Sequence, residues 1–372
     1  MSKLTKYKFS DLYEMSSGIS SSKEQAGHGS PFISFSTVFN NYFLPEELPD
    51  LMDTSLKEQE IFSVKKDDVF ITRTSETVDA LAMSCVAVKD YTKATFSGFV
   101  KRLRPKTTGI VYSKYIAFFL RSKYFRKVLD CNTIMTLRAS FNEDMFSFLY
   151  LYLPDYEEQV RIGDLLYKME IKIRTNNKIN DNLAAMAYDI YMHTFFSKKP
   201  NAKLKDILTE AEKSSIQVGE AKISNGKYPF FTSGSTILKW NEPFVNGRNC
   251  FLNTGGNADV KFYVGKAAYS TDTWSVSAKS EMSDYLYLML FSIRPELDQK
   301  FFQGTGLKHL QKPLLKDRPI YVPEKMELEA FNRQVMPMFD IISENTRENQ
   351  QLTSLRDWLL PMLMNGQATI SD

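Results

Sequence analysis

Residues 153–190 read LPDYEEQVRIGDLLYKMEIKIRTNNKINDNLAAMAYDI, and they carry the strongest structural signal in the chain. Apolar residues recur in it every seven positions, which is the pattern of a helix that packs along another helix in a coiled coil. The same pattern returns at residues 322–359, displaced by 169 positions. The stripe consists of Ile162, Met169, Asn176, Leu183 and Ile190 in the first copy, and of Phe331, Met338, Asn345, Leu352 and Leu359 in the second.

Each copy of the helix interrupts its apolar stripe with an asparagine, Asn176 or Asn345. A polar residue at such a position costs stability but fixes the register and the number of partner helices. We therefore predict that helices at residues 154–196 and 323–372 pair with each other, antiparallel, inside one chain. About 40 residues at about 1.5 Å per residue make each helix roughly 60 Å long, enough to hold two globular units apart. Two amphipathic helices packed in a common core are the alternative.

The regions outside these helices, residues 1–153 and 197–322, have the pattern of mixed α/β units. Short apolar runs typical of strands occur at residues 68–72 and 249–253, and each is followed by a turn rich in Ser, Thr, Asn or Gly. Such turns can bring backbone N–H groups and short polar side chains to phosphates and base edges. They are also typical of ordinary loops.

The net charge of +3 is distributed unevenly along the chain. Residues 1–153 and 197–322 carry +3 and +6, whereas residues 154–196 and 323–372 carry −2 and −4. The two basic segments favour binding to a polyanion such as nucleic acid. The acidic helices would then bind a different kind of partner. A composition of 43% hydrophobic and 13% aromatic residues excludes a disordered chain and allows each globular unit its own core.

Cysteine, histidine and hydropathy patterns exclude several further classes of protein. The three cysteines and three histidines are scattered, which argues against a metal site and favours a reducing compartment. No run approaches the roughly 20 apolar residues that cross a bilayer, and the N-terminus lacks the apolar core of a secretory signal. We therefore expect no metal and no cofactor in this chain, and a cytoplasmic location.

Two short motifs resemble those of adenine methyltransferases. Residues 302–306, FQGTG, spell the FxGxG associated with S-adenosylmethionine binding, and residues 241–244, NEPF, resemble the catalytic NPPF. The first is preceded by the charged segment 295–300 instead of a buried strand, and the second has Glu242 in place of the first proline. We therefore expect that the chain is not an enzyme. An intrinsic methyltransferase ranks third, behind the two functions considered below.

The arrangement as a whole resembles the specificity subunits of Type I restriction–modification systems. Residues 153–162, LPDYEEQVRI, are similar to the L-P-x-x-E-Q-x-x-I element of that family. The second copy keeps Pro323 and Glu327 but has Leu328 where the family pattern has glutamine. The loop TGLKHL at residues 305–310, just before the second copy, is a further sign, and the resemblance covers essentially the whole chain.

The resemblance implies an α+β fold with two mixed α/β target recognition domains in pseudo-twofold repeat, separated by two long helices that form an antiparallel coiled coil. Domains 1 and 2 would occupy residues 1–153 and 197–322, and spacer helices 1 and 2 residues 154–196 and 323–372. Each domain would read one half of a bipartite DNA target. The alternative is a non-catalytic protein-interaction scaffold, with two adaptor domains on a coiled-coil strut.

Partners and cofactors follow from the same resemblance. The implied partners are double-stranded DNA, two adenine methyltransferase (modification) subunits and restriction motor–nuclease subunits, with no membrane involved. S-adenosylmethionine, ATP and Mg²⁺ would be bound by the partner subunits and not by this chain.

The candidate DNA contacts are basic or short polar residues in loop-like or basic stretches. Arginine can contact guanine with two hydrogen bonds, and lysine neutralises phosphates. For any single residue, a solvated surface charge is the alternative. The candidates are Arg73, Thr74, Lys101, Arg102, Arg104 and Arg138 in the first domain, and Thr254, Asn257, Thr305 and Lys308 in the second. Asn176 and Asn345 are expected to set the register of the helix spacer.

Overall fold

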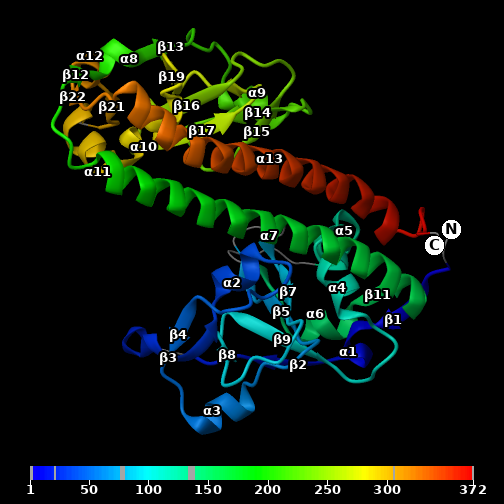
Figure 1. The fold of residues 1–372 in the computed structure, drawn as a ribbon. Coiled ribbons are helices and arrows are strands. Elements are labelled where there is room, and N and C mark those ends of the chain that lie inside the picture. Colours follow the sequence, from blue (N-terminus) through cyan, green and yellow to red (C-terminus); the bar gives the residue numbers. More distant parts are fainter. Residues whose placement is uncertain (1–2, 21, 76–79, 133–138, 305, 371–372) are drawn as a thin grey trace. The chain divides into compact units, whose positions relative to one another are not determined.

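The computed structural model describes residues 3–20, 22–75, 80–132, 139–304 and 306–370 (Figure 1). The chain divides into two compact units, one made of Met1–Ile171 with Leu352–Asp372 and the other of Lys172–Gln351. The boundary between them falls inside both long helices, α7 (Tyr156–Phe195) and α13 (Lys325–Met364). Each unit therefore combines a mixed α/β domain with a part of each long helix.

The first unit is built on a four-stranded antiparallel sheet in the order β2-β9-β5-β7. Smaller sheets have the orders β1-β11, β10-β6 and β4-β3-β8. The strands are β1 (Thr5–Lys8), β2 (Tyr13–Ser17), β3 (Ala26–Ile33), β4 (Asp50–Met52), β5 (Val69–Thr72), β6 (Thr74–Ser75), β7 (Ser84–Val86), β8 (Thr95–Phe96), β9 (Val100–Pro105), β10 (Ala139–Ser140) and β11 (Tyr150–Leu153). The helices are α1 (Phe9–Leu12), the short 3-10 turn Lys23–Gln25, α2 (Phe35–Asn40), α3 (Leu56–Ile61), α4 (Ser113–Phe119), α5 (Lys123–Asn132) and α6 (Glu143–Phe148).

The side chains of strand β5 show that this sheet is buried on both faces. Side chains alternate along a strand, so Val69 and Ile71 point into one apolar cluster while Phe70 points into the other. The first cluster is covered by α4 and by the beginning of α7. At this contact Gly163 is required, because a Cβ there would lie only 2.8 Å from the backbone nitrogen of Tyr115. The strand predicted at residues 68–72 is thus β5, which lies in the interior of the sheet.

In the second unit, the large sheet, the terminal strand pair and the three-stranded sheet repeat those of the first. Its four-stranded sheet has the order β13-β19-β16-β17, and its smaller sheets have the orders β12-β22, β15-β14-β18 and β20-β21. The strands are β12 (Ala202–Lys203), β13 (Leu208–Glu210), β14 (Tyr228–Phe231), β15 (Leu238–Trp240), β16 (Arg248–Asn253), β17 (Val260–Val264), β18 (Ala268–Tyr269), β19 (Thr273–Ala278), β20 (Phe302–Gln303), β21 (His309–Leu310) and β22 (Pro319–Ile320). The helices are α8 (Leu204–Ile207), α9 (Val218–Lys222), α10 (Ser283–Ser292), α11 (Arg294–Glu296), the π-helical turn Leu297–Phe301 and α12 (Lys312–Lys316).

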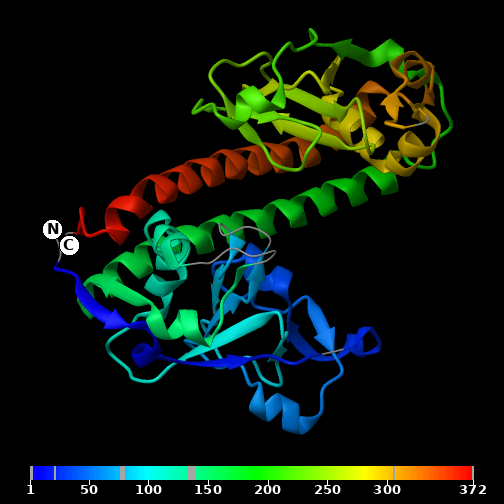
Figure 2. The ribbon, with the colours of Figure 1, turned by 180° about the vertical axis from the view of Figure 1, so that it is seen from behind.

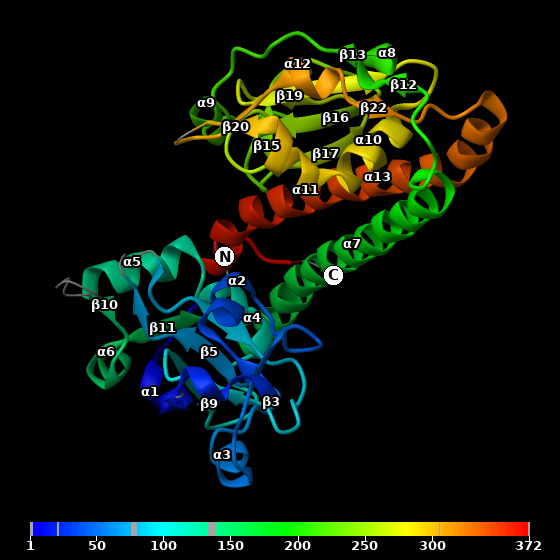
Figure 3. The ribbon, with the colours of Figure 1, turned by 90° about the vertical axis from the view of Figure 1, so that its left-hand side faces the viewer.

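Strand pairing makes the correspondence between the two domains specific. Thr72 of β5 lies opposite Val100 of β9, and Asn253 of β16 lies opposite Thr273 of β19. In both domains a parallel pair, β3-β8 or β14-β18, accompanies the larger sheet. Figure 3 shows α10 packed along β16 and β17, as α4 packs on the sheet of the first domain. The predicted α+β fold with a repeated mixed domain is confirmed.

The two long helices pair antiparallel, as predicted. Within the second unit, Asn176 Nδ2 donates to Asn349 Oδ1 (2.9 Å) and to Glu348 Oε2 (2.7 Å). Asn345 Nδ2 donates in turn to Asn180 Oδ1 (2.8 Å), so residue numbers rise along α7 as they fall along α13 (Figure 2). Asn176 and Asn345 therefore both lie in the helix pair. Each donates to an asparagine of the other helix, and that asparagine lies one turn after the helix's own interrupting asparagine.

Candidate DNA interface

One end of the first domain's large sheet gathers several of the candidate residues. Arg73 directly follows the central strand β5, and its N–H donates to the carbonyl of Phe99 (2.9 Å), just before β9. The carbonyl of Arg73 accepts from the N–H of Phe141 (2.8 Å), which follows β10. Thr74 of β6 pairs with Ser140 of β10. Arg73 is exposed and Thr74 is half-buried, so the end of this sheet presents an arginine to solvent with a partly accessible threonine next to it.

The second domain has the same framework at the same end of its sheet. The N–H of Thr254, which follows β16, donates to the carbonyl of Asp272 (2.9 Å), just before β19. The carbonyl of Thr254 accepts from the N–H of Leu310 in β21 (3.0 Å). Thr254 is therefore the structural counterpart of Arg73, although the two side chains share no chemistry.

Two further candidates of the second domain come together around Thr254. The N–H of Gly256 donates to the carbonyl of Lys308 (3.0 Å), and Asn253 Nδ2 donates to the carbonyl of Asn257 (3.1 Å). Asn257 and Lys308 are both exposed. The Lys308 ammonium lies 3.2 Å from Asp298, an ion pair at the surface that contributes little and can exchange for another anion.

A cleft of about 540 Å³ opens beside this cluster. Trp274 lines it and is 4% exposed, and the ammonium of Lys312 lies 4.9 Å from the centre of the indole ring. Burial lowers the pKa of Lys312, and Glu210 opposes that shift. His309 also lines the cleft, although the sequence patterns did not single it out. Its position corresponds to Ser140 of β10, which only the strand pairing reveals.

Lys101 is near the same end of the first sheet but is largely buried. Its ammonium donates to Ser17 Oγ (2.8 Å) on the neighbouring strand and lies 4.0 Å from Glu143. Burial lowers the pKa of Lys101; Glu143 opposes the shift and Arg73 adds to it. Lys101 therefore adds positive electrostatic potential beneath Arg73, and its burial makes a direct contact with DNA less favourable.

Arg102 and Arg104 are engaged by the protein itself. Arg104 Nε and Nη2 donate to the two carboxylate oxygens of the fully buried Asp68 (2.7 and 2.6 Å). Arg102 Nη1 donates to the carbonyl of Ser63 (2.7 Å), which also accepts from Arg104 (3.0 Å). The pairing with Asp68 raises the pKa of Arg104, while burial lowers that of Arg102. Both guanidinium groups hold the sheet to the α3–β5 loop, so the proposal below rests on the exposed residues. Arg138 and Thr305 lie outside the described residues.

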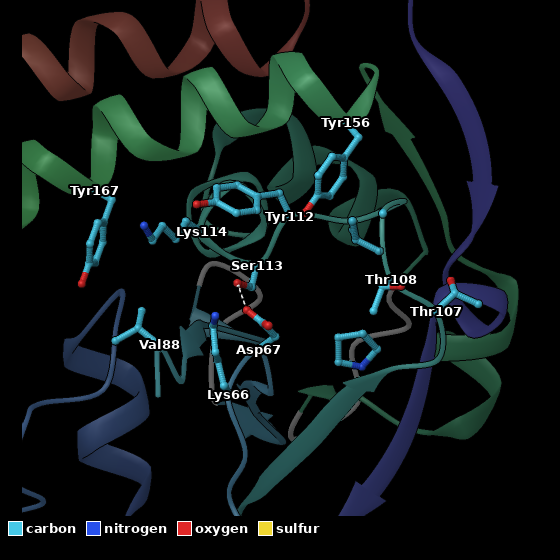
Figure 4. A pocket seen from close by; sticks show the side chains of 13 residues that line it. Lys66, Asp67, Val88, Thr107, Thr108, Tyr112, Ser113, Lys114, Tyr156 and Tyr167 are labelled. Carbon is cyan, nitrogen blue, oxygen red and sulfur yellow. Dashed lines mark hydrogen bonds between the residues drawn. The ribbon is translucent and has the colours of Figure 1, made fainter. Parts of the chain in front are cut away.

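A second cavity, of about 370 Å³, lies at the opposite end of the first sheet (Figure 4). Its wall includes Asp67, which precedes β5 and accepts from Ser113. Figure 4 shows Tyr112 and Lys114 turned towards α7, where both donate to Asp164 Oδ1 (2.7 and 2.8 Å). These contacts attach the first domain to α7. The polar residues that line this cavity therefore have a structural role.

The described residues contain neither of two other kinds of site. None of their His, Cys, Asp and Glu side chains form a group of three or more that could hold a metal ion. In the same part of the chain, no helix has the length and apolar character needed to cross a membrane.

Each of the two repeated domains presents basic or polar residues at one end of its large sheet, and each is joined to the paired long helices. The sequence matches the family described as "Type I restriction modification DNA specificity domain" over residues 1–185 and again over 198–354, and the chain belongs to this family. Members of the family recognise DNA and are themselves non-catalytic, so this chain is a DNA-recognition subunit whose partners are DNA and other restriction–modification subunits.

Individual relatives are distant but similar along their whole length. The chain is 20% identical to the MjaIX specificity subunit of Methanocaldococcus jannaschii, covering 98% of this chain and 93% of that protein. It is 22% identical to the HindI specificity subunit of Haemophilus influenzae, covering 90% of this chain and 94% of the relative. A crystal structure of a Type I S subunit from M. genitalium shares the fold, with a TM-score of 0.66 at 13% identity over 97% of this chain and 96% of that one.

Proposed function

We propose that this chain reads a bipartite DNA target and directs adenine methyltransferase subunits to it. The observation that carries the proposal is the matching sheet end of the two domains, with Arg73 and Thr74 in one and Thr254, Asn257 and Lys308 in the other. Equal frameworks with different side chains suit two domains that bind DNA in the same way and read different bases, because phosphate contacts set register while a few side chains select bases. Residues 1–153 and 197–322 are the proposed recognition domains.

The long helices are proposed to serve as spacer and as partner-binding element. Asn176 and Asn345 bond across the helix pair and would hold a single register, and so one distance between half-sites. Large apolar side chains remain exposed on both helices, which supports docking of protein partners there. They are Ile171, Ile179 and Met186 on α7, and Ile341, Leu355 and Trp358 on α13.

The partners proposed are two adenine methyltransferase subunits and, in a restriction complex, motor–nuclease subunits. The methyltransferase would supply S-adenosylmethionine and flip the target adenine out of the duplex, and the motor–nuclease would use ATP and Mg²⁺. The complex would act in the cytoplasm, where the DNA is.

A genome-wide map of adenine methylation tests the function. In cells that produce this chain together with its companion methyltransferase, we expect one split motif of two short halves at fixed spacing. Cells with either protein alone should show none. A soluble, associated complex that methylates no motif would favour the protein-interaction scaffold, and a motif made by this chain alone would show that it is itself a methyltransferase.

Lys308→Ala tests the phosphate-contacting part of the proposed interface. Loss of one phosphate contact should weaken binding to every duplex alike and reduce the slope of log K against log salt by about 0.9. The measurement is a salt titration of DNA affinity in the assembled complex. Lys325→Ala, at an exposed lysine at the start of α13, is the matched control and should leave the slope unchanged. An unaltered slope for Lys308→Ala would remove this residue from the DNA face.

A further inference from the structure

Phe99 and Asp272 occupy the same place in the two domains. Each is the residue immediately before the strand that pairs with the central strand, β9 in one domain and β19 in the other. The carbonyl of each accepts a hydrogen bond of 2.9 Å from the residue that follows the central strand, Arg73 or Thr254. The two side chains therefore emerge beside the residues on which the proposed DNA contacts rest.

The turn that carries Phe99 is well held, yet its aromatic side chain is 66% exposed. The N–H of Gly98 donates to the carbonyl of Ile19 (2.7 Å), and that of Val100 to the carbonyl of Ser97 (2.9 Å). The N–H of Phe99 itself donates to Ser97 Oγ (3.2 Å). Within the described residues, no aromatic ring or cation stacks on Phe99. A fixed turn thus presents an apolar surface to solvent next to an exposed arginine.

Asp272 is an exposed carboxylate where a DNA-binding face would be expected to avoid one. Its carbonyl is bonded by Thr254 and by Ser233 Oγ (2.8 Å), so the backbone is fixed. Among the described residues, no ion pair or hydrogen bond engages its carboxylate, and Asp272 lines the cleft that Thr254 also lines. Phosphates repel a carboxylate, so on such a face it is favourable only opposite a hydrogen-bond donor.

We propose that Phe99 and Asp272 are the matched specificity-determining residues of the two domains, Phe99 contacting the 5-methyl group of a thymine and Asp272 accepting a hydrogen bond from the exocyclic amino group of a cytosine or adenine. The major groove offers both groups, and apolar side chains contact the first while carboxylates accept from the second. Arg73 and Thr254 would hold the neighbouring base or phosphate. The inference rests on the proposed function, since it assigns bases within the two half-sites.

Single-atom changes in the DNA test the Phe99 contact. Each thymine of the half-site read by the first domain, on either strand, is replaced by deoxyuracil, and the affinity of the assembled complex is measured. We expect one replacement to weaken wild-type binding by about threefold to tenfold, as for the loss of one buried methyl group, and to have no further effect on Phe99→Ala. Phe196→Ala, at a phenylalanine of similar exposure (56%) in the second unit, should respond like the wild type. If Phe99→Ala keeps the full wild-type response, or if no thymine matters, the Phe99 assignment is wrong.

The Asp272 contact is tested by removing amino groups from the other half-site. Cytosine is replaced by 2-pyrimidinone and adenine, apart from the methylated one, by purine, so that the two kinds of donor are distinguished. We expect one replacement to weaken wild-type binding by about tenfold or more, as for a hydrogen bond to a charged group, and Asp272→Ala to be insensitive to it. Asp189→Ala, an exposed aspartate on α7, is the control.

The outcomes separate this inference from the function on which it rests. A wild-type complex that methylates a split motif, combined with variants that respond to every analogue as the wild type does, would overturn the specificity roles and leave the DNA-recognition function intact. A wild-type complex that selects no motif would overturn the proposed bipartite recognition instead.

Discussion

Arg104→Ala is expected to lower the free energy of unfolding of the first unit by about 3–5 kcal/mol. Asp68 has no exposed side-chain surface, and Arg104 supplies two of the hydrogen bonds to its carboxylate. Without the guanidinium, the backbone N–H of Lys65 (2.7 Å) is the donor that remains to this buried carboxylate among the described residues. Hydrogen exchange measures the loss, because the amides of β5 and β9 exchange through opening of this unit.

A double-mutant cycle is the control for this result. Adding Asp68→Asn removes the buried charge, so the double variant should be more stable than Arg104→Ala alone. The amides of β16 and β19 in the second unit should keep their protection and serve as an internal reference. A loss below about 1 kcal/mol, or equal losses in both units, would contradict the role assigned to this ion pair.

Exchange of residues 1–153 for the first domain of another family member is expected to replace one half of the methylated motif completely and leave the other half unchanged. The reason is that the residues proposed to read DNA in each domain are held by that domain's own strands. The structure supports this choice of ends, because β1 pairs with β11, so that residues 5–8 and 150–153 move together. The measurement is the adenine methylation map of cells with the hybrid.

The reciprocal exchange, of residues 197–322, should change only the other half of the motif. The core beneath the first domain includes Ile162 and Leu166 of α7, so the hybrid must pack on these side chains as well. A second hybrid that also carries the donor's residues 154–171 checks whether a loss of activity reflects that packing. Modular reading would be refuted by an active hybrid in which both halves of the motif had changed.

The long helices and their pairing could be predicted from the sequence because their signals are local and repeated. A seven-residue period is a property of consecutive residues, and the same period at a displacement of 169 residues identifies two equivalent helices. The interrupting asparagines indicated a coiled coil with a fixed register. In the structure Asn176 bonds Asn349 and Asn345 bonds Asn180, as two equivalent antiparallel helices require.

The role of the basic stretch around β9 could not be predicted in the same way. Lys101, Arg102 and Arg104 are close together in the sequence and look like one charged cluster. Arg102 and Arg104 meet Ser63 and Asp68, which come more than 30 residues earlier, only when β5 pairs with β9. Lys101 instead meets Ser17 and Glu143, which are also distant in the sequence. Charge is visible in a sequence, but whether a partner within the protein already satisfies it is not.

Periodicity and composition predicted the two mixed α/β units and the paired helices, and the resemblance of a short motif to the specificity-subunit family implied DNA recognition. Only the tertiary structure decided that Arg73 and Thr254 are counterparts, and that Phe99 and Asp272 stand beside them. Those positions carry unlike side chains, so no sequence similarity connects them. What they share is a backbone hydrogen bond to a neighbouring strand, and that bond exists only once the sheet has formed.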